Sequence, residues 1–190
     1  MIITHYYHKN DLPFQRLTTL PDDEALLLME QLSEKSGLVY RRFKNPPNYL
    51  SDRKITEKWL YDEFIKTGGN PKLKSPYYFV VEKSLWIEEG YNGESLQIQI
   101  PVEKIDPSII SFTYSDSMVS FWLGEQLGKP FYKHDYHGKV FSLEEIKTII
   151  NVVGIPNDEW KTELSKKYDF FIEAQLWDEQ PINQYMNFIK

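Results

Sequence analysis

Three strand-like segments in the middle of the chain leave little room for helices between them, and this spacing most constrains the fold. They are PYYFVVE (76–82), SLQIQIPV (95–102) and SIISFTY (108–114), all rich in the β-branched and aromatic residues that favour strands. In the second segment, apolar residues alternate with serine and glutamine, which predicts one buried face and one wetter face. Because parallel neighbours need a long crossover connection, usually a helix, the spacing predicts mostly antiparallel pairing.

Helical periodicity surrounds these strands on both sides. We expect a first strand over 2–7 and a last strand within DFFIEAQLWDEQPI (169–182). Helices are expected over 21–37, 51–69, 115–124, 142–154 and 156–168. A terminal helix should follow, with Ile182, Tyr185, Met186 and Ile189 at helical spacing. The order of these elements predicts a single α+β domain over 1–190. Its sheet should be mostly antiparallel, with four to six strands and flanking helices.

Two local patterns give more specific expectations. Pro46 and Pro47 predict an irregular segment over 41–50, because proline disrupts a helix interior. The helix after it should turn Ile55, Trp59 and Phe64 inward.

Composition excludes several classes of protein. The net charge of −6 argues against general nucleic-acid binding. No apolar run approaches the roughly 20 residues that span a bilayer, so we expect no membrane insertion. The chain has no cysteine, which removes disulfides and thiolate sites. The opening MIITHYYHKN lacks the basic-then-apolar layout of a secretory signal, and we expect a bacterial, cytoplasmic protein.

A basic segment interrupts this acidic chain. Residues 41–74 contain nine Lys or Arg residues and four acids, which gives the segment a net charge of about +5. One interpretation is a solvated helix with its connecting loops. The other is a face that receives a phosphate or an acidic partner.

Glu173 lies among aromatic residues in the last strand segment. A period of two predicts two faces, Phe170, Ile172, Ala174 and Leu176 on one and Phe171, Glu173, Gln175 and Trp177 on the other. Burial beside aromatic rings raises the pKa of a carboxylate unless a cation or donors compensate. The pattern predicts either a functional carboxylate or a structural ion pair, with Arg41, Arg42 or Arg53 as the candidate partners.

Histidines provide two further candidates. His5, flanked by tyrosine, is suited either to acid–base chemistry or to ordinary packing with its polar tip satisfied. In KHDYHG (133–138), His134, Asp135 and His137 are competent metal ligands, which suggests a metal-assisted hydrolase. The other interpretation of KHDYHG is structural hydrogen bonding or plain exposure.

Several familiar catalytic motifs are absent from the sequence. These are the phosphate-binding loop, the Gly-x-Ser-x-Gly nucleophile elbow and the Gly-x-Gly-x-x-Gly dinucleotide fingerprint. Ser115, Asp116 and Ser117 form the polar triplet SDS, which we interpret as a helix cap rather than a nucleophile.

Short segments carry two resemblances. LPDDEA, TEKWLYDEFI, GGNP, ISFTYSDSM, YHGKVFSLEEI and YDFFIEAQLWD resemble segments of a family of uncharacterised bacterial proteins of similar length, which implies no activity. The order of ITHYYHKNDLPF, SPYYFVV and FIEAQLWDEQPI resembles that of ADP-ribosyltransferases, including the DNA-modifying toxin branch. In one subgroup of that superfamily, the order His, Tyr, Glu marks the NAD site.

By position, this second resemblance implies a site made of His5, Tyr77 or Tyr78, and Glu173. Glu173 would stabilise the oxocarbenium-like charge that develops when the nicotinamide–ribose bond breaks. The tyrosine would stack on nicotinamide, His5 would hold the adenosine-side ribose, and the basic segment with Arg53 would face the pyrophosphate. One departure is Phe171, which occupies the position where arginine-modifying relatives carry a second acid or amide.

The expected function is therefore an ADP-ribosyltransferase-like domain that binds NAD as a substrate and transfers ADP-ribose to an acceptor. One alternative is a non-enzymatic protein whose aromatic residues line a pocket or a protein interface, since such side chains are favoured there. The other alternative is the metal-assisted hydrolase.

Overall fold

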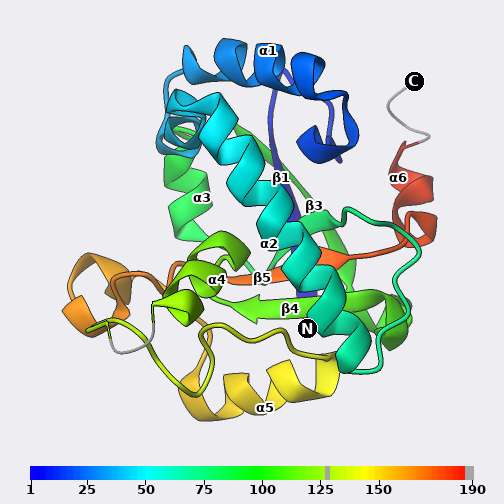
Figure 1. Ribbon diagram of the computed structural model, residues 1–190. Coiled ribbons are helices and arrows are strands. Elements are labelled where there is room, and N and C mark those ends of the chain that lie inside the picture. The colour runs from blue at the N-terminus through cyan, green and yellow to red at the C-terminus, as the bar shows by residue number, and fades with distance from the viewer. Residues whose placement is uncertain (127–128, 187–190) are drawn as a thin grey trace.

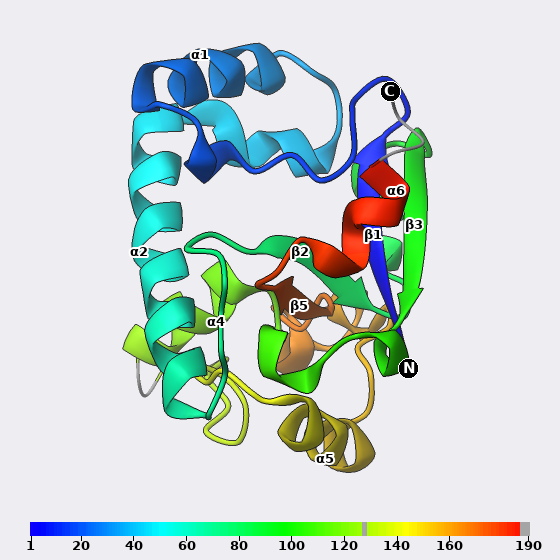
Figure 2. The same cartoon turned by 90° about the vertical axis from the view of Figure 1, so that its right-hand side faces the viewer.

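The computed structural model describes residues 1–126 and 129–186 (Figure 1). Its main elements, in chain order, are β1 (Ile2–His8), α1 (Asp22–Ser33), α2 (Pro46–Lys66), β2 (Tyr77–Val81), α3 (Leu85–Gly90), β3 (Ser95–Pro101), β4 (Ile110–Tyr114), α4 (Ser117–Glu125), α5 (Leu143–Val153), β5 (Ile172–Leu176) and α6 (Asn183–Met186). A 3₁₀ segment, η2 (Leu38–Lys44), connects α1 to α2. The α+β class is confirmed, and Figure 2 shows α1 and α5 at opposite ends with the strands between them.

The described strands form one antiparallel sheet of five, in the order β3-β1-β2-β5-β4. β1 pairs with β3 along its whole length but with β2 only at Ile3 and Thr4. The sheet is strongly twisted, so β1 and β3 run steeply relative to β4 and β5 (Figure 1). The short β1–β2 ladder means that the two strands separate beyond Thr4.

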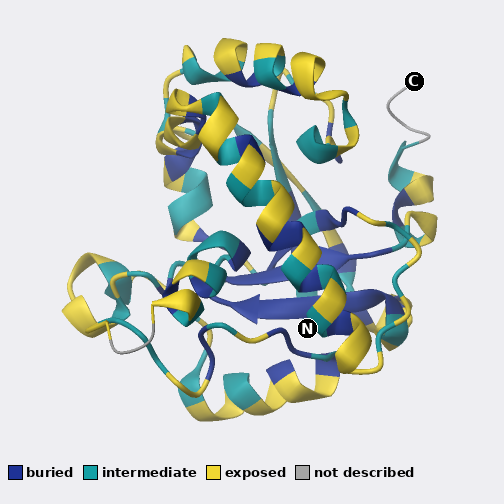
Figure 3. Ribbon diagram, in the orientation of Figure 1, coloured by how far each residue is buried: buried dark blue, intermediate teal, exposed yellow. Residues whose placement is uncertain are grey.

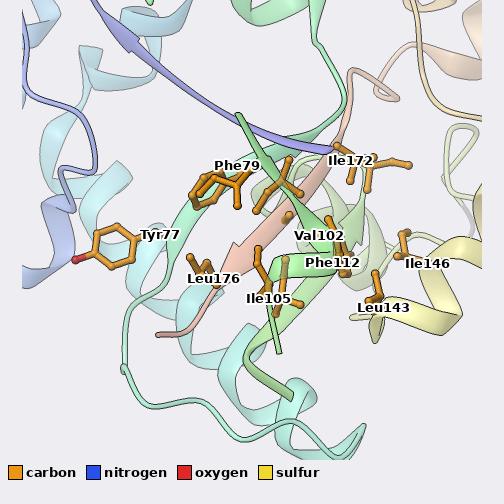
Figure 4. Packing of buried hydrophobic residues seen from close by; sticks show 14 of the residues in the cluster. Tyr77, Phe79, Val102, Ile105, Phe112, Leu143, Ile146, Ile172 and Leu176 are labelled. Carbon is orange, nitrogen blue, oxygen red and sulfur yellow. The ribbon is translucent and has the colours of Figure 1, made fainter. Parts of the chain in front are cut away.

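The face of the sheet that packs against α5 carries the largest apolar cluster. Cross-strand rows place six side chains on this face: Tyr77, Leu176 and Ile110, and beside them Phe79, Ala174 and Phe112. Leu143 and Ile146 of α5 complete the packing (Figure 4). β4 and β5 are buried along their whole length, whereas the helices keep exposed outer faces (Figure 3).

The opposite face of the sheet packs against α2. The fully buried Trp177 stacks on Phe64 of α2, with ring centroids 6.0 Å apart. α1, η2 and the start of α2 share a separate apolar cluster, made of Ala25, Met29, Val39, Tyr40, Phe43 and Leu50. These elements and α3 surround the middle of this face without filling it, and the cavity described below lies there.

The prediction of an irregular segment over 41–50 is wrong in its second half. α2 begins at Pro46 because prolines at the first positions of a helix give up only N–H groups that have no intrahelical partner. The side chain of Asn45 accepts from the backbone N–H of Asn48 and caps the helix. The buried face of α2 also differs from the prediction, since Phe64 is buried but Ile55 is 47% exposed.

Other boundaries were predicted with mixed success. The helix expected over 156–168 is instead two 3₁₀ turns, Glu159–Lys161 and Leu164–Lys166. Leu164 is 70% exposed, whereas Trp160 packs against Phe170 with ring centroids 5.7 Å apart, so the segment does not bury a continuous helical stripe. α1 ends at Ser33 rather than near residue 37, and α3 was not predicted. Ile189, expected in the terminal helix, lies outside the described residues.

Among the helices within residues 1–126 and 129–186, none has the length and apolar character needed to span a membrane.

Candidate functional site

A cavity of about 370 Å³ lies on the α2 face of the sheet. This volume falls within the range of about 300–1,000 Å³ that is typical of small-molecule sites. The strands β1, β2 and β5 form its floor, and η2, α2, α3 and the start of α4 form its walls. Thr4, Val80 and Glu173 are cross-strand neighbours on that floor. Glu173, the carboxylate singled out by the sequence, therefore faces the cavity.

A buried hydrogen-bond chain fixes the orientation of Glu173. The indole Nε1–H of Trp177 donates to Ser111 Oγ at 2.8 Å, and Ser111 Oγ–H donates to Gln175 Oε1 at 2.8 Å. The Gln175 amide nitrogen then donates to both Thr113 Oγ1 and Glu173 Oε1, each at 3.1 Å. The indole N–H can only donate, and the Gln175 amide is oriented with Oε1 toward Ser111 and its nitrogen toward Glu173, which gives the chain its direction. Glu173 Oε1 is thus an acceptor in either protonation state.

Arg53, Tyr78 and Glu57 form a second group on the cavity wall. The Arg53 guanidinium lies over the Tyr78 ring, 3.8 Å from its centroid, and donates to Ser117 Oγ at 3.2 Å. The Tyr78 hydroxyl donates to Glu57 Oε1 at 2.9 Å, and Arg53 Nε lies 3.6 Å from the same oxygen. Side chains that are mutually held in this way present a preorganised cation next to Glu173.

The electrostatic environment of Glu173 makes it titrate near neutrality. Burial raises the pKa of the Glu173 carboxyl, and the negative charge of Asp116 raises it further. The charge of Arg53 and hydrogen bonds from Ser117 and Gln175 oppose this, and the resulting pKa is about 7. Of the three arginines considered as structural partners, Arg53 is the one whose charge acts on Glu173, but its closest carboxylate contact is with Glu57.

Arg42 brings the basic segment to the cavity. Its Nε donates to the Val39 carbonyl at 2.6 Å, which fixes the guanidinium plane against η2. The side chain is exposed and lines the cavity, and no carboxylate in the described part of the chain pairs with it. The terminal nitrogens are therefore positioned to bind an anionic group of a ligand.

Aromatic rings line another wall of the cavity. Trp86 of α3 packs against Phe170 and Phe171, with ring centroids 5.1 Å and 5.8 Å apart. Phe170 was expected on the strand face that carries Ile172, but it precedes the strand and lines the cavity. These rings offer a flat apolar surface to a planar ligand group.

His5 contributes to the cavity wall, but both of its ring nitrogens are occupied. Nδ1–H donates to the Tyr78 carbonyl at 2.8 Å, and Nε2 accepts from the Phe14 backbone N–H at 2.9 Å. The ring thus spans the gap where β1 and β2 separate. Burial lowers the pKa of His5 to about 4, so the imidazole is neutral at physiological pH. His5 fastens the segment around Phe14 to the sheet and has no free nitrogen for a ribose hydroxyl.

Of the two candidate tyrosines, only Tyr78 faces the cavity. Tyr77 lies on the opposite face of the sheet, in the row with Leu176 and Ile110 (Figure 4). Its ring is covered by the Arg16 guanidinium, 4.3 Å from the centroid. The structure therefore brings together Glu173, Tyr78 and Arg53 and separates them from Tyr77.

The residues of the KHDYHG segment do not converge. His134 and Asp135 are exposed, whereas His137 is buried, with Nε2 3.0 Å from Asp169 Oδ1 and Nδ1 accepting from the Lys133 N–H. Within the described ranges, no group of three or more His, Asp or Glu side chains is arranged to hold a metal ion. The geometry thus gives no support to the metal-assisted hydrolase.

Sequence reasoning missed the roles of Gln175 and Asp116 in this site. Gln175 was placed on the same strand face as Glu173, but its contacts depend on the register with β4, which no local pattern reveals. Asp116 was interpreted as a helix cap, and this is confirmed, because its Oδ1 accepts from the N–H groups of Met118 and Val119. The polar alternation of Ser111 and Thr113 within an apolar strand was the available signal for the buried network.

Comparison with known proteins provides no relative on which to base a function. No family model, no curated protein and no solved structure matches this chain.

Proposed function

We propose that this protein binds NAD, or a closely related dinucleotide, in the cavity and breaks its nicotinamide–ribose bond to transfer ADP-ribose. The observation that carries the proposal is the meeting of Glu173, Tyr78 and Arg53, from β5, β2 and α2, in one cavity. Two of them, Tyr78 and Glu173, are residues of the predicted His–Tyr–Glu order, and Arg53 belongs to the basic segment.

The chemistry follows from the charges in the cavity. Cleavage of the nicotinamide–ribose bond develops positive charge on the ribose ring, which an ionised Glu173 stabilises electrostatically. Gln175 holds Glu173 Oε1 in place, so no reorganisation is needed when that charge develops. The guanidinium of Arg42, which lines the cavity, is suited to the pyrophosphate. His5, in this proposal, positions the loop rather than the ribose.

The test is a titration with NAD combined with an assay of nicotinamide release. The wild-type protein should bind NAD in calorimetry, and release should increase as the pH rises from 6 to 8, because Glu173 ionises with a pKa of about 7. Glu173→Gln should lower the release rate by about 100-fold or more, the effect of losing one preorganised electrostatic group. Glu30→Gln, on the exposed side of α1, is the matched control. Absence of both binding and release in the wild type would reject the proposal.

Binding without turnover is the second candidate function. It is favoured by the aromatic wall of Trp86, Phe170 and Phe171. It is also favoured by His5, because both of its ring nitrogens are already hydrogen-bonded. In this case, NAD or another planar anionic ligand would bind, and no nicotinamide would appear on prolonged incubation.

A further inference from the structure

Asp116 places a second carboxylate beside Glu173. Asp116 lies two residues after the end of β4, and Thr113 of β4 pairs with Glu173 of β5. Asp116 lines the same cavity as Glu173. Its Oδ1 accepts from the backbone N–H groups of Met118 at 2.9 Å and Val119 at 3.1 Å. These bonds hold the side chain rigidly at the start of α4 and engage one of its two oxygens.

Transfer of ADP-ribose needs a group that removes a proton from the incoming nucleophile. Arg42 and Arg53 cannot accept a proton, and both nitrogens of His5 are engaged. Glu57 Oε1 accepts from the Tyr78 hydroxyl and is paired with Arg53, so the charge of this carboxylate already has a cation beside it. Glu173 itself faces the developing positive charge in the proposed function. Among the described residues that line the cavity, Asp116 is the carboxylate that fits this task.

We infer that Asp116 is the general base of the site and accepts the proton of the attacking water or acceptor hydroxyl. The inference rests on the proposed function. In the step, the bond between ribose C1′ and the nicotinamide nitrogen breaks, and its electron pair leaves with neutral nicotinamide. The nucleophile oxygen forms a bond to C1′, and its proton passes to Asp116 and from there to solvent.

The test uses water as the acceptor, so that no unknown partner is required. Asp116→Asn retains the helix cap, because asparagine accepts the same N–H bonds, but it cannot take a proton. We expect the Kd for NAD to stay within about threefold and the rate of nicotinamide release to fall by about 100-fold, the lower end of a general-base contribution. Added formate, a small external base, should partly restore the rate in Asp116→Ser, where the shortened side chain leaves room for it, and leave the wild type unchanged.

Asp106→Asn is the matched control. Asp106 caps the turn before β4 through the Ser108 N–H at 2.8 Å, and it does not line the cavity. It should release nicotinamide at the wild-type rate. Asp116→Ser, which also keeps a capping oxygen, repeats the test if the asparagine variant loses its thermal transition.

The outcomes separate the inference from the proposed function. An Asp116→Asn protein that releases nicotinamide at the wild-type rate overturns the inference and leaves the proposed function standing. A reduced rate without rescue by formate also overturns it, since the loss is then structural. A wild-type protein that binds NAD but never releases nicotinamide overturns both the general base and the transfer reaction and leaves binding without turnover. One that does not bind NAD rejects the proposed function itself.

Discussion

Glu173 imposes a conflict between reactivity and stability at the scale of a single residue. Its pKa in the folded protein is about 7, above the value of 4.5 that applies to an unperturbed glutamate. Folding therefore favours the protonated form, and the contribution of Glu173 to stability is fully present below pH 4.5. It is lost as the pH rises through 7. The ionised carboxylate that the proposed chemistry needs is thus the form that destabilises the fold.

This conflict predicts that Glu173→Gln stabilises the protein at alkaline pH. Glutamine resembles the protonated acid, so the free energy of unfolding should increase relative to the wild type by about 2 kcal/mol more at pH 8 than at pH 5. Urea denaturation at the two pH values measures the difference, with Glu30→Gln as the control. A difference between variant and wild type that does not change with pH would show that burial does not penalise the carboxylate.

His5 predicts the opposite pH dependence. Its folded-state pKa of about 4 lies below the ordinary value of 6.5, so protonation is resisted in the folded protein. Its contribution to stability is present above pH 6.5 and is lost as the pH falls toward 4. Between pH 7.5 and 5 the wild type should lose about 2 kcal/mol through this residue. His5→Gln should lack that loss, whereas the exposed His134→Gln should retain it. Identical acid sensitivity in all three proteins would contradict the assignment.

At the scale of elements, local signals were reliable where side chains at a helix end hydrogen-bond the free backbone N–H groups of that same end. The capping box of α5 was predicted and confirmed: Ser142 Oγ accepts from the Glu145 N–H, and Glu145 accepts from the Ser142 N–H. The start of α2 also has a local signal, proline at the first helical positions after the Asn45 cap, which the prediction did not use. The segment 156–168 depends instead on packing, and no local pattern shows that Leu164 is exposed.

The capping box of α5 gives a prediction that separates stability from function. Ser142→Ala should lower the free energy of unfolding by about 1 kcal/mol, because the backbone N–H of Glu145 loses its acceptor. The affinity for NAD should not change, since α5 packs on the face opposite the cavity. Chemical denaturation and calorimetry on the same preparation test both statements. A weakened affinity would indicate that the two faces of the sheet are coupled.

At the scale of the whole molecule, the sheet divides the chain into a structural face and a site face. Strand alternation was enough to predict which residues of β5 lie on each face, and the order of the segments pointed to Glu173 and to Tyr77 or Tyr78 as candidates. What remained hidden was the pairing between strands. Tyr77 and Tyr78 cannot be distinguished until the register with β5 assigns one to each face. The register between β4 and β5 brings Gln175 to Ser111, across 64 residues of sequence.

The direction of the buried chain beneath the cavity has one more consequence. From Trp177 through Ser111 to Gln175, each group donates toward Glu173, and an amide stands between the hydroxyl and the carboxylate. An amide in that position does not relay protons, so no proton reaches Glu173 through the buried hydrogen-bond chain. Glu173 exchanges its proton with water through the open side of the cavity. A ligand that fills the cavity would therefore lock Glu173 in the charge state it had at the moment of closure.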